Sequence, residues 1–147
     1  MTAATILGSR RAGEVPLDLM PFIVAGPAGR RTAKGLAFDK AGEGFVFYGP
    51  YISLPPGRYR VRIDMAAPAR LPWHPPVPPL PVVLDVVDGP TLLAETCVVP
   101  ARRTTAQLDV LHDGRGTPSF EVRLRKTAGS VGYVRRLVLE ALADPPG

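Results

Sequence analysis

Residues 58–65 alternate between apolar and polar side chains, and this period-two run constrains the fold more than any other feature of the sequence. One side of the run carries three arginines and Asp64, and the other carries Tyr59, Val61, Ile63 and Met65. A helix would not separate the two kinds of residue in this way. The alternation therefore predicts a β-strand with one buried side and one side that faces water.

Frequent turns divide the chain into short segments. The 147 residues include 18 prolines and 15 glycines, and their spacing in the first third interrupts any helix early. The sequence Asp88-Gly89-Pro90 joins two apolar runs as a hairpin turn would. Apolar or alternating runs predict strands at residues 19–24, 36–38, 45–48, 51–54, 58–65, 82–87, 91–99, 106–110, 120–124 and 133–142. Together they predict an all-β fold, an antiparallel β-sandwich.

The chain has the length of one domain, because single cores usually occupy about 100–150 residues. We expect residues 1–34 to form an N-terminal arm with the first short strand or strands, and residues 35–143 to form the sandwich. Residues 68–81 contain seven prolines, so we expect an exposed loop with polyproline II character there. Neither a membrane-spanning apolar run nor a signal-peptide pattern is present, and we expect no membrane insertion.

Three short motifs stand out between residues 49 and 89: a Gly-Pro-Tyr step at 49–51, a Leu-Pro-x-Gly-x-Tyr turn at 54–59, and an Asp-Val pair followed by Asp-Gly at 85–89. They resemble motifs of jelly-roll carbohydrate-binding modules with a galactose-binding-like fold. The similarity extends over about residues 42–142 and is greatest to modules found near bacterial glycosyltransferases and surface-polysaccharide proteins. It implies a jelly-roll sandwich that binds carbohydrate and catalyses no reaction.

The last predicted strand departs from this family at a place that bears on metal binding. Many of these modules hold calcium with acidic residues near the N-terminus and in the last strand, whereas this strand reads Tyr133-Val134-Arg135-Arg136. Arginine offers no oxygen to a calcium ion, which needs several oxygen ligands. A Cys/His zinc cluster lacks ligands too, since the chain has one cysteine and two histidines. We therefore expect no metal site and no cofactor, and structural calcium is not supported.

Aromatic residues in predicted loops are the first candidates for ligand contact. Trp73 and His74 lie in the proline-rich segment, where a stiff loop would hold an aromatic platform for the apolar face of a sugar ring. The alternative is that Trp73 folds back as a lid over the core. Tyr48 and Tyr51 flank the Gly-Pro step, and we expect one to pack inward and the other to line a rim. The other two tyrosines begin apolar alternations and are expected in the core: Tyr59 and Tyr133.

Arginines are the second group of candidates, because 15 of the 18 basic residues are arginine and the net charge is +5. Arg58, Arg60 and Arg62 share one side of a predicted strand, and Arg123 and Arg125 share one side of another. If these strands were neighbours in one sheet, the arginines would form a basic surface for uronates, sulfates or phosphates. The alternative is a solvated face on which Asp64, Glu121 and Glu140 pair with the arginines.

Catalytic constellations have little support in the sequence. Cys97 lies within a predicted strand, where a small buried hydrophobe is the usual role. His112 ends a strand beside Asp113 and is expected to cap it. A glycosidase needs two carboxylates across a cleft, but the close acidic pairs are expected to form turns: Asp85 with Asp88, and Asp109 with Asp113. We therefore expect the protein not to be an enzyme.

These observations favour a non-catalytic, lectin-like bacterial domain that binds an acidic or cell-surface polysaccharide. The alternative is a structural or attachment subunit of an assembly, such as a virion-like particle, a spike or a secretion apparatus, with the sandwich used for protein contacts. Nucleic-acid binding is disfavoured because outward aromatics are not interleaved with the basic residues on one strand.

Overall fold

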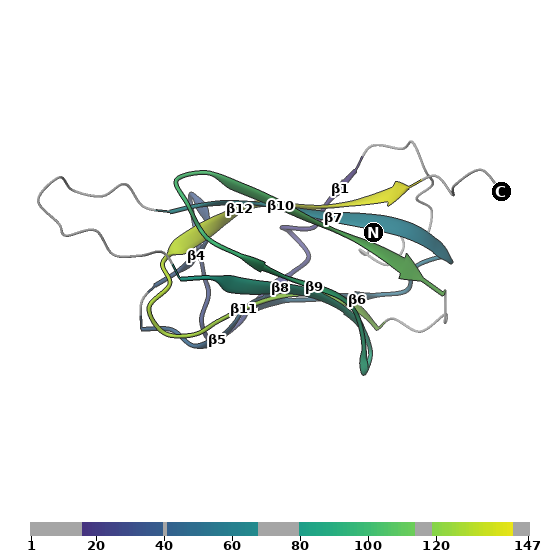
Figure 1. Cartoon of the computed structure of the whole chain (residues 1–147), viewed down its shortest axis with the longest axis horizontal. Helices are drawn as coiled ribbons and strands as arrows, with labels where there is room; N and C mark the ends of the chain where they lie inside the picture. The colour runs from purple at the N-terminus through teal and green to yellow at the C-terminus, as the bar shows by residue number, and fades with distance from the viewer. Residues whose placement is uncertain (1–15, 40, 68–79, 114–118, 143–147) are drawn as a thin grey trace, which may run out of the picture.

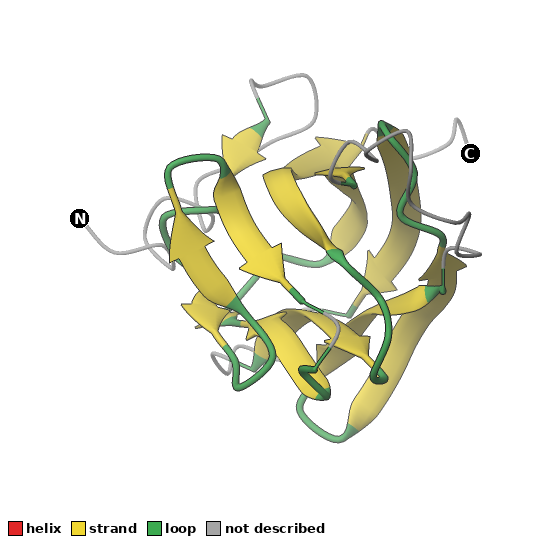
Figure 2. Cartoon of the chain, turned by 90° about the vertical axis from the view of Figure 1, so that its left-hand side faces the viewer, coloured by secondary structure: helices red, strands yellow, loops and turns green. Residues whose placement is uncertain are grey.

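The computed structural model describes residues 16–39, 41–67, 80–113 and 119–142, which form two antiparallel β-sheets packed face to face (Figures 1 and 2). Every strand pair in this part of the chain is antiparallel. The predicted all-β antiparallel sandwich is therefore confirmed. Among the described residues, no helix has the length and apolar character needed to span a membrane.

Sheet A has the strand order β10-β7-β12-β4-β3, with β1 also paired to β12. The alternating run 58–65 lies in an interior strand, β7, between β10 and β12, where Ile63 faces Ala106 on one side and Leu137 on the other. The strands of this sheet are β1 (Leu17–Asp18), β3 (Arg30–Thr32), β4 (Gly35–Phe38), β7 (Gly57–Ala66), β10 (Thr104–His112) and β12 (Gly132–Leu142).

Sheet B has the order β2-β5-β11-β8-β9, with β6 also paired to β11. The turn between β8 and β9 is the predicted hairpin, and Gly89 adopts the positive φ of 59° that such tight turns require. The strands of this sheet are β2 (Val24–Ala25), β5 (Gly44–Tyr48), β6 (Pro50–Ile52), β8 (Val82–Asp88), β9 (Thr91–Val98) and β11 (Phe120–Lys126).

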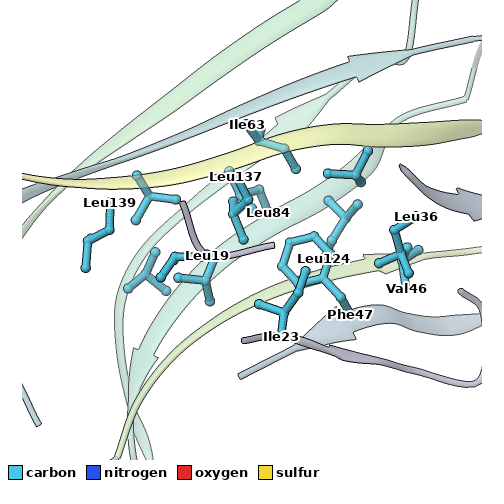
Figure 3. Packing of buried hydrophobic residues seen from close by; sticks show 14 of the residues in the cluster. Leu19, Ile23, Leu36, Val46, Phe47, Ile63, Leu84, Leu124, Leu137 and Leu139 are labelled. Carbon is cyan, nitrogen blue, oxygen red and sulfur yellow. The ribbon is translucent and has the colours of Figure 1, made fainter. Parts of the chain in front are cut away.

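The core lies between the two sheets and is made by the inward side of each alternating strand. Ile63 and Leu137 of sheet A meet Phe47, Leu84 and Leu124 of sheet B, and all five side chains are fully buried (Figure 3). Burying such side chains is the main favourable contribution to folding. The two outer faces carry polar and aromatic side chains together with exposed aliphatic ones such as Leu92 and Leu111.

The core differs from expectation at one of the two tyrosines. Tyr59 is buried, as predicted, and its hydroxyl donates a hydrogen bond to the carbonyl of Pro55. Tyr133 is only half-buried and lies outside the core cluster, so that prediction is wrong. The reason is the register of β12, in which Val134 points inward while Tyr133 lies opposite Ala37 and Ala66.

The segment 19–24 is a second difference, because only its last residue lies in a strand. Pro21 lacks a backbone N–H, and the chain turns around it, with the N–H groups of Phe22 and Ile23 donating to the carbonyl of Leu19. Leu19 and Ile23 are nevertheless buried in the core. The described part of the expected N-terminal arm therefore packs on both sheets.

Candidate functional site

Four of the nine predicted ligand-binding residues lie together on the outer face of sheet B, the side away from the core. Tyr48 is on β5, Tyr51 on β6, and Arg123 and Arg125 on β11. Trp73 and His74 fall in residues 68–79, which lie outside the described residues. The remaining three are on β7 in sheet A: Arg58, Arg60 and Arg62. The two groups of arginines are therefore on different sheets and do not form one basic surface.

An aromatic row runs along this outer face from β5 to β6, the two strands that pair successively with β11. The ring centroids of Phe45 and Tyr48 are 6.3 Å apart with planes at 74°, and those of Tyr48 and Tyr51 are 6.3 Å apart with planes at 63°. Both are edge-to-face contacts of the kind that aromatic pairs favour. Tyr51 ends the row and is 49% exposed, while the other two rings are half-buried. The row thus presents one accessible ring supported by two others.

The backbone around Tyr51 is unusual for a bulky residue. Its φ is +58°, in the left-handed region that tyrosine rarely adopts. The chain is held there from both sides: the N–H of Val122 donates to the carbonyl of Gly49, and Ile52 pairs with Phe120 and is buried. Strained residues of this kind gather at ligand sites, where the surrounding structure holds them in place.

Glu121 fixes the hydroxyl end of the same ring. The carboxylate of Glu121 is buried and accepts a hydrogen bond from the Tyr51 hydroxyl. This bond, with partial burial and the negative charge of Glu121, raises the pKa of Tyr51 to about 12. The phenol therefore stays protonated at neutral pH.

A row of charges continues from the aromatic residues across β11, β8 and β9. Arg123 stacks over the Phe45 ring, 5.1 Å from its centroid, and donates to both carboxylate oxygens of Asp85 at 2.7 and 3.0 Å. Arg125 contacts Asp85 at 3.3 Å and Glu95 at 3.1 Å. Asp85 is fully buried in the middle of β8, so the prediction that it forms a turn is wrong. Asp85 lies opposite Arg123 in the sheet, and there it accepts hydrogen bonds from Arg123 and Arg125.

The charge of this face follows from those pairs. Two guanidinium groups, on Arg123 and Arg125, face three carboxylates, on Asp85, Glu95 and Glu121. The hydrogen bond to Asp85 raises the pKa of Arg123. The face therefore combines an exposed ring with a polar network in which both guanidinium groups have carboxylate partners.

Two arginines of β7, Arg60 and Arg62, also have carboxylate partners, on the outer face of sheet A. Arg60 donates to both oxygens of Asp109 at 2.8 and 3.1 Å, which holds the pKa of that carboxyl below its usual range. Arg62 lies 3.7 Å from Glu140. Asp109 is thus a cross-strand partner within β10, and its expected role in a turn is wrong. These pairs agree with the alternative interpretation, in which carboxylates pair with the arginines on a solvated face.

Three contributors to the sheet B face were missed by the sequence analysis: Phe45, Asp85 and Glu95. Glu121 was expected there as a carboxylate partner of the arginines, because it alternates with Arg123 on the same strand and shares its face. The β8–β9 hairpin was predicted, but placing Asp85 and Glu95 beside the arginines also needed the pairing of β8 with β11, which the sequence pattern does not specify. Cys97 was also misplaced: it is exposed, because it lies on the edge strand β9 opposite the half-buried Val83.

Comparisons with known proteins give structural matches and no match in sequence. No protein-family model matches the chain, and no curated protein matches it. One similar structure is the carbohydrate-binding module CBM6cm-2 of Cellvibrio mixtus lichenase 5A in complex with cellotriose, with a TM-score of 0.49, 13% identity and 94% coverage of each chain. Another is TmCBM61 in complex with β-1,4-galactotriose, with a TM-score of 0.47, 15% identity, and coverage of 86% of this chain and 87% of that one.

Proposed function

We propose that the protein is a non-catalytic carbohydrate-binding domain and that a neutral glycan binds on the outer face of sheet B. The observation that carries the proposal is the Tyr51 ring, which is 49% exposed although its backbone is strained. A sugar ring has apolar C–H faces that pack on such an aromatic surface, while its hydroxyls need polar partners close by. Glu121 and Arg123 supply those partners beside the ring.

The preorganisation of the face supports the same proposal. Tyr51 is held by Tyr48 and Glu121, and Arg123 is held by Asp85 and Phe45. Side chains that are already ordered lose little conformational entropy when a ligand binds. This face offers stacking and hydrogen bonding, which are the two kinds of contact that a hydroxyl-rich ligand makes.

An acidic polysaccharide is less well supported by this face than the sequence suggested. Arg123 and Arg125 are engaged by carboxylates, and the three carboxylates outnumber them. A uronate or sulfate would have to compete with Asp85 for the same guanidinium groups. We therefore place neutral oligosaccharides ahead of acidic ones.

A glycan array that contains neutral, uronate and sulfated oligosaccharides tests the proposal. The array is run at two salt concentrations, and the oligosaccharide that binds best is then titrated by calorimetry. Binding to a neutral glycan should change little with salt, because screening acts on charged contacts. Tyr51→Ala should weaken binding roughly tenfold, equivalent to about 1.4 kcal/mol for a lost aromatic contact.

Tyr133→Ala is the matched control, since Tyr133 is a partly exposed tyrosine on the outer face of the other sheet. It should leave the affinity unchanged. The proposal fails if no glycan binds, or if Tyr133→Ala weakens binding as much as Tyr51→Ala. Binding only to acidic glycans, abolished by salt, would keep a carbohydrate function but would reject the neutral ligand and this face.

A further inference from the structure

A pocket of about 480 Å³ opens at one end of the sandwich, between strand ends of both sheets. It lies where β8 and β10 end and where β7 and β9 begin. Its walls include backbone and small or apolar side chains, among them Gly57, Thr91 and Leu93. Three potential metal ligands also line it: Asp88, His112 and Asp113.

The donor atoms of these three residues are close enough to share one ion. One ligand atom from each lies within 4.8 Å of the other two, and His112 Nε2 is 3.2 Å from Asp88 Oδ2. Ligands at metal–ligand distances of about 2.0–2.2 Å in a tetrahedral site are about 3.3–3.6 Å apart. Asp88 and His112 therefore already have nearly that spacing, and a small rotation of the exposed Asp113 side chain would bring it closer.

Two of the three ligands are held rigidly below the surface. The side chains of His112 and Asp88 are 2% and 4% exposed. The His112 ring packs edge-to-face on Phe120, with centroids 5.8 Å apart, and the Ser119 hydroxyl donates a hydrogen bond to Oδ1 of Asp88. Such supporting contacts orient metal ligands and strengthen binding. They leave Oδ2 of Asp88 directed toward the imidazole.

We propose that Asp88, His112 and Asp113 bind one divalent transition-metal ion of the zinc class. The imidazole nitrogen selects against calcium and magnesium, which prefer all-oxygen sites. Three protein ligands leave a fourth tetrahedral position, and the pocket provides room for water there. Counting cysteines and histidines does not predict this site, because two of its three ligands are carboxylates.

Zinc titration of the untagged, EDTA-treated protein tests the proposal. A Cys97→Ser background removes the exposed thiol as a competing ligand. We expect one equivalent of Zn²⁺ to bind by calorimetry, and Co²⁺ to give a visible spectrum that Zn²⁺ displaces. Asp113→Asn should weaken zinc binding at least about tenfold, because it removes one of three protein ligands. Asp113 is exposed, so this change should leave the fold intact.

Asp109→Asn is the matched control, because Asp109 lies on the same strand as His112 but pairs with Arg60 outside the pocket. It should bind zinc like the background protein. The proposal is overturned if the background protein binds no stoichiometric zinc, or if the two Asp→Asn variants bind it equally. His112→Gln, checked for folding by circular dichroism, should abolish binding; if it does not fold, the Asp113→Asn comparison still decides.

Discussion

At the scale of single residues, Tyr51 combines exposure with backbone strain and a fixed hydroxyl. Its φ of +58° is unfavourable for tyrosine, yet packing of Ile52 and the hydrogen bond between Val122 and Gly49 maintain it. The result is a ring that stands out from the sheet instead of joining the core. The local sequence places a tyrosine after Gly-Pro, but its direction comes from the pairing of β6 with β11.

Glu121→Gln should lower the pKa of Tyr51 from about 12 toward its ordinary value of 10, because it weakens the hydrogen bond to a carboxylate and removes the charge that opposes ionisation of the phenol. The folded protein holds this proton more tightly than the unfolded chain does. The contact therefore contributes stability below pH 10 that is lost as the pH rises toward 12. Titration of the tyrosine ring carbons by NMR measures the shift. An unchanged pKa in the variant would contradict the assigned hydrogen bond.

At the scale of strands, the row Arg123–Asp85–Glu95 crosses three neighbours of sheet B in register. Asp85→Asn keeps the shape of the side chain but removes the charge that two guanidinium groups share. We expect a loss of about 1–3 kcal/mol in the free energy of unfolding, because Asp85 is fully buried.

Asp109→Asn is the comparison for that measurement, since Asp109 is paired to Arg60 on the other sheet but both side chains are partly exposed. Solvent screens such pairs, so its effect should be clearly smaller. Urea denaturation followed by circular dichroism gives both values. If both variants lost the same free energy of unfolding, burial of Asp85 would add nothing to the stability that its ion pairs contribute.

The strands also show which features of the fold the sequence pattern can predict. Alternation predicted β7 and β11 and the outward direction of Arg60 and Arg123, because side-chain direction is a local property of an extended chain. It could not predict that the two strands belong to different sheets, since many pairings satisfy the same alternation. That pairing decides which carboxylate each arginine meets, and hence the charge of the candidate site.

Ligand contact by Trp73 and His74 stays a prediction, because both residues lie outside the described part of the chain.

At the scale of the whole molecule, both sheets depend on residues near the N-terminus. β1 pairs with β12 in sheet A, and β2 pairs with β5 in sheet B. Leu19 lies between them, fully buried, and its N–H donates to the carbonyl of Leu137 (Figure 3). The sequence predicted an arm here because prolines and glycines interrupt the apolar pattern. Burial of isolated apolar residues such as Leu19 is not visible in a periodic pattern.

Leu19→Ala should therefore destabilise the entire sandwich, by about 2–5 kcal/mol for a leucine truncated in a closed core. Leu111→Ala is the control, because Leu111 is 72% exposed and its truncation should change stability by no more than about 0.5 kcal/mol. Urea unfolding of the full chain, followed by circular dichroism, should show a single transition that shifts only for Leu19→Ala. Equal stabilities of the two variants would mean that residues 16–34 are a separable arm, and the single-core account of the fold would then be wrong.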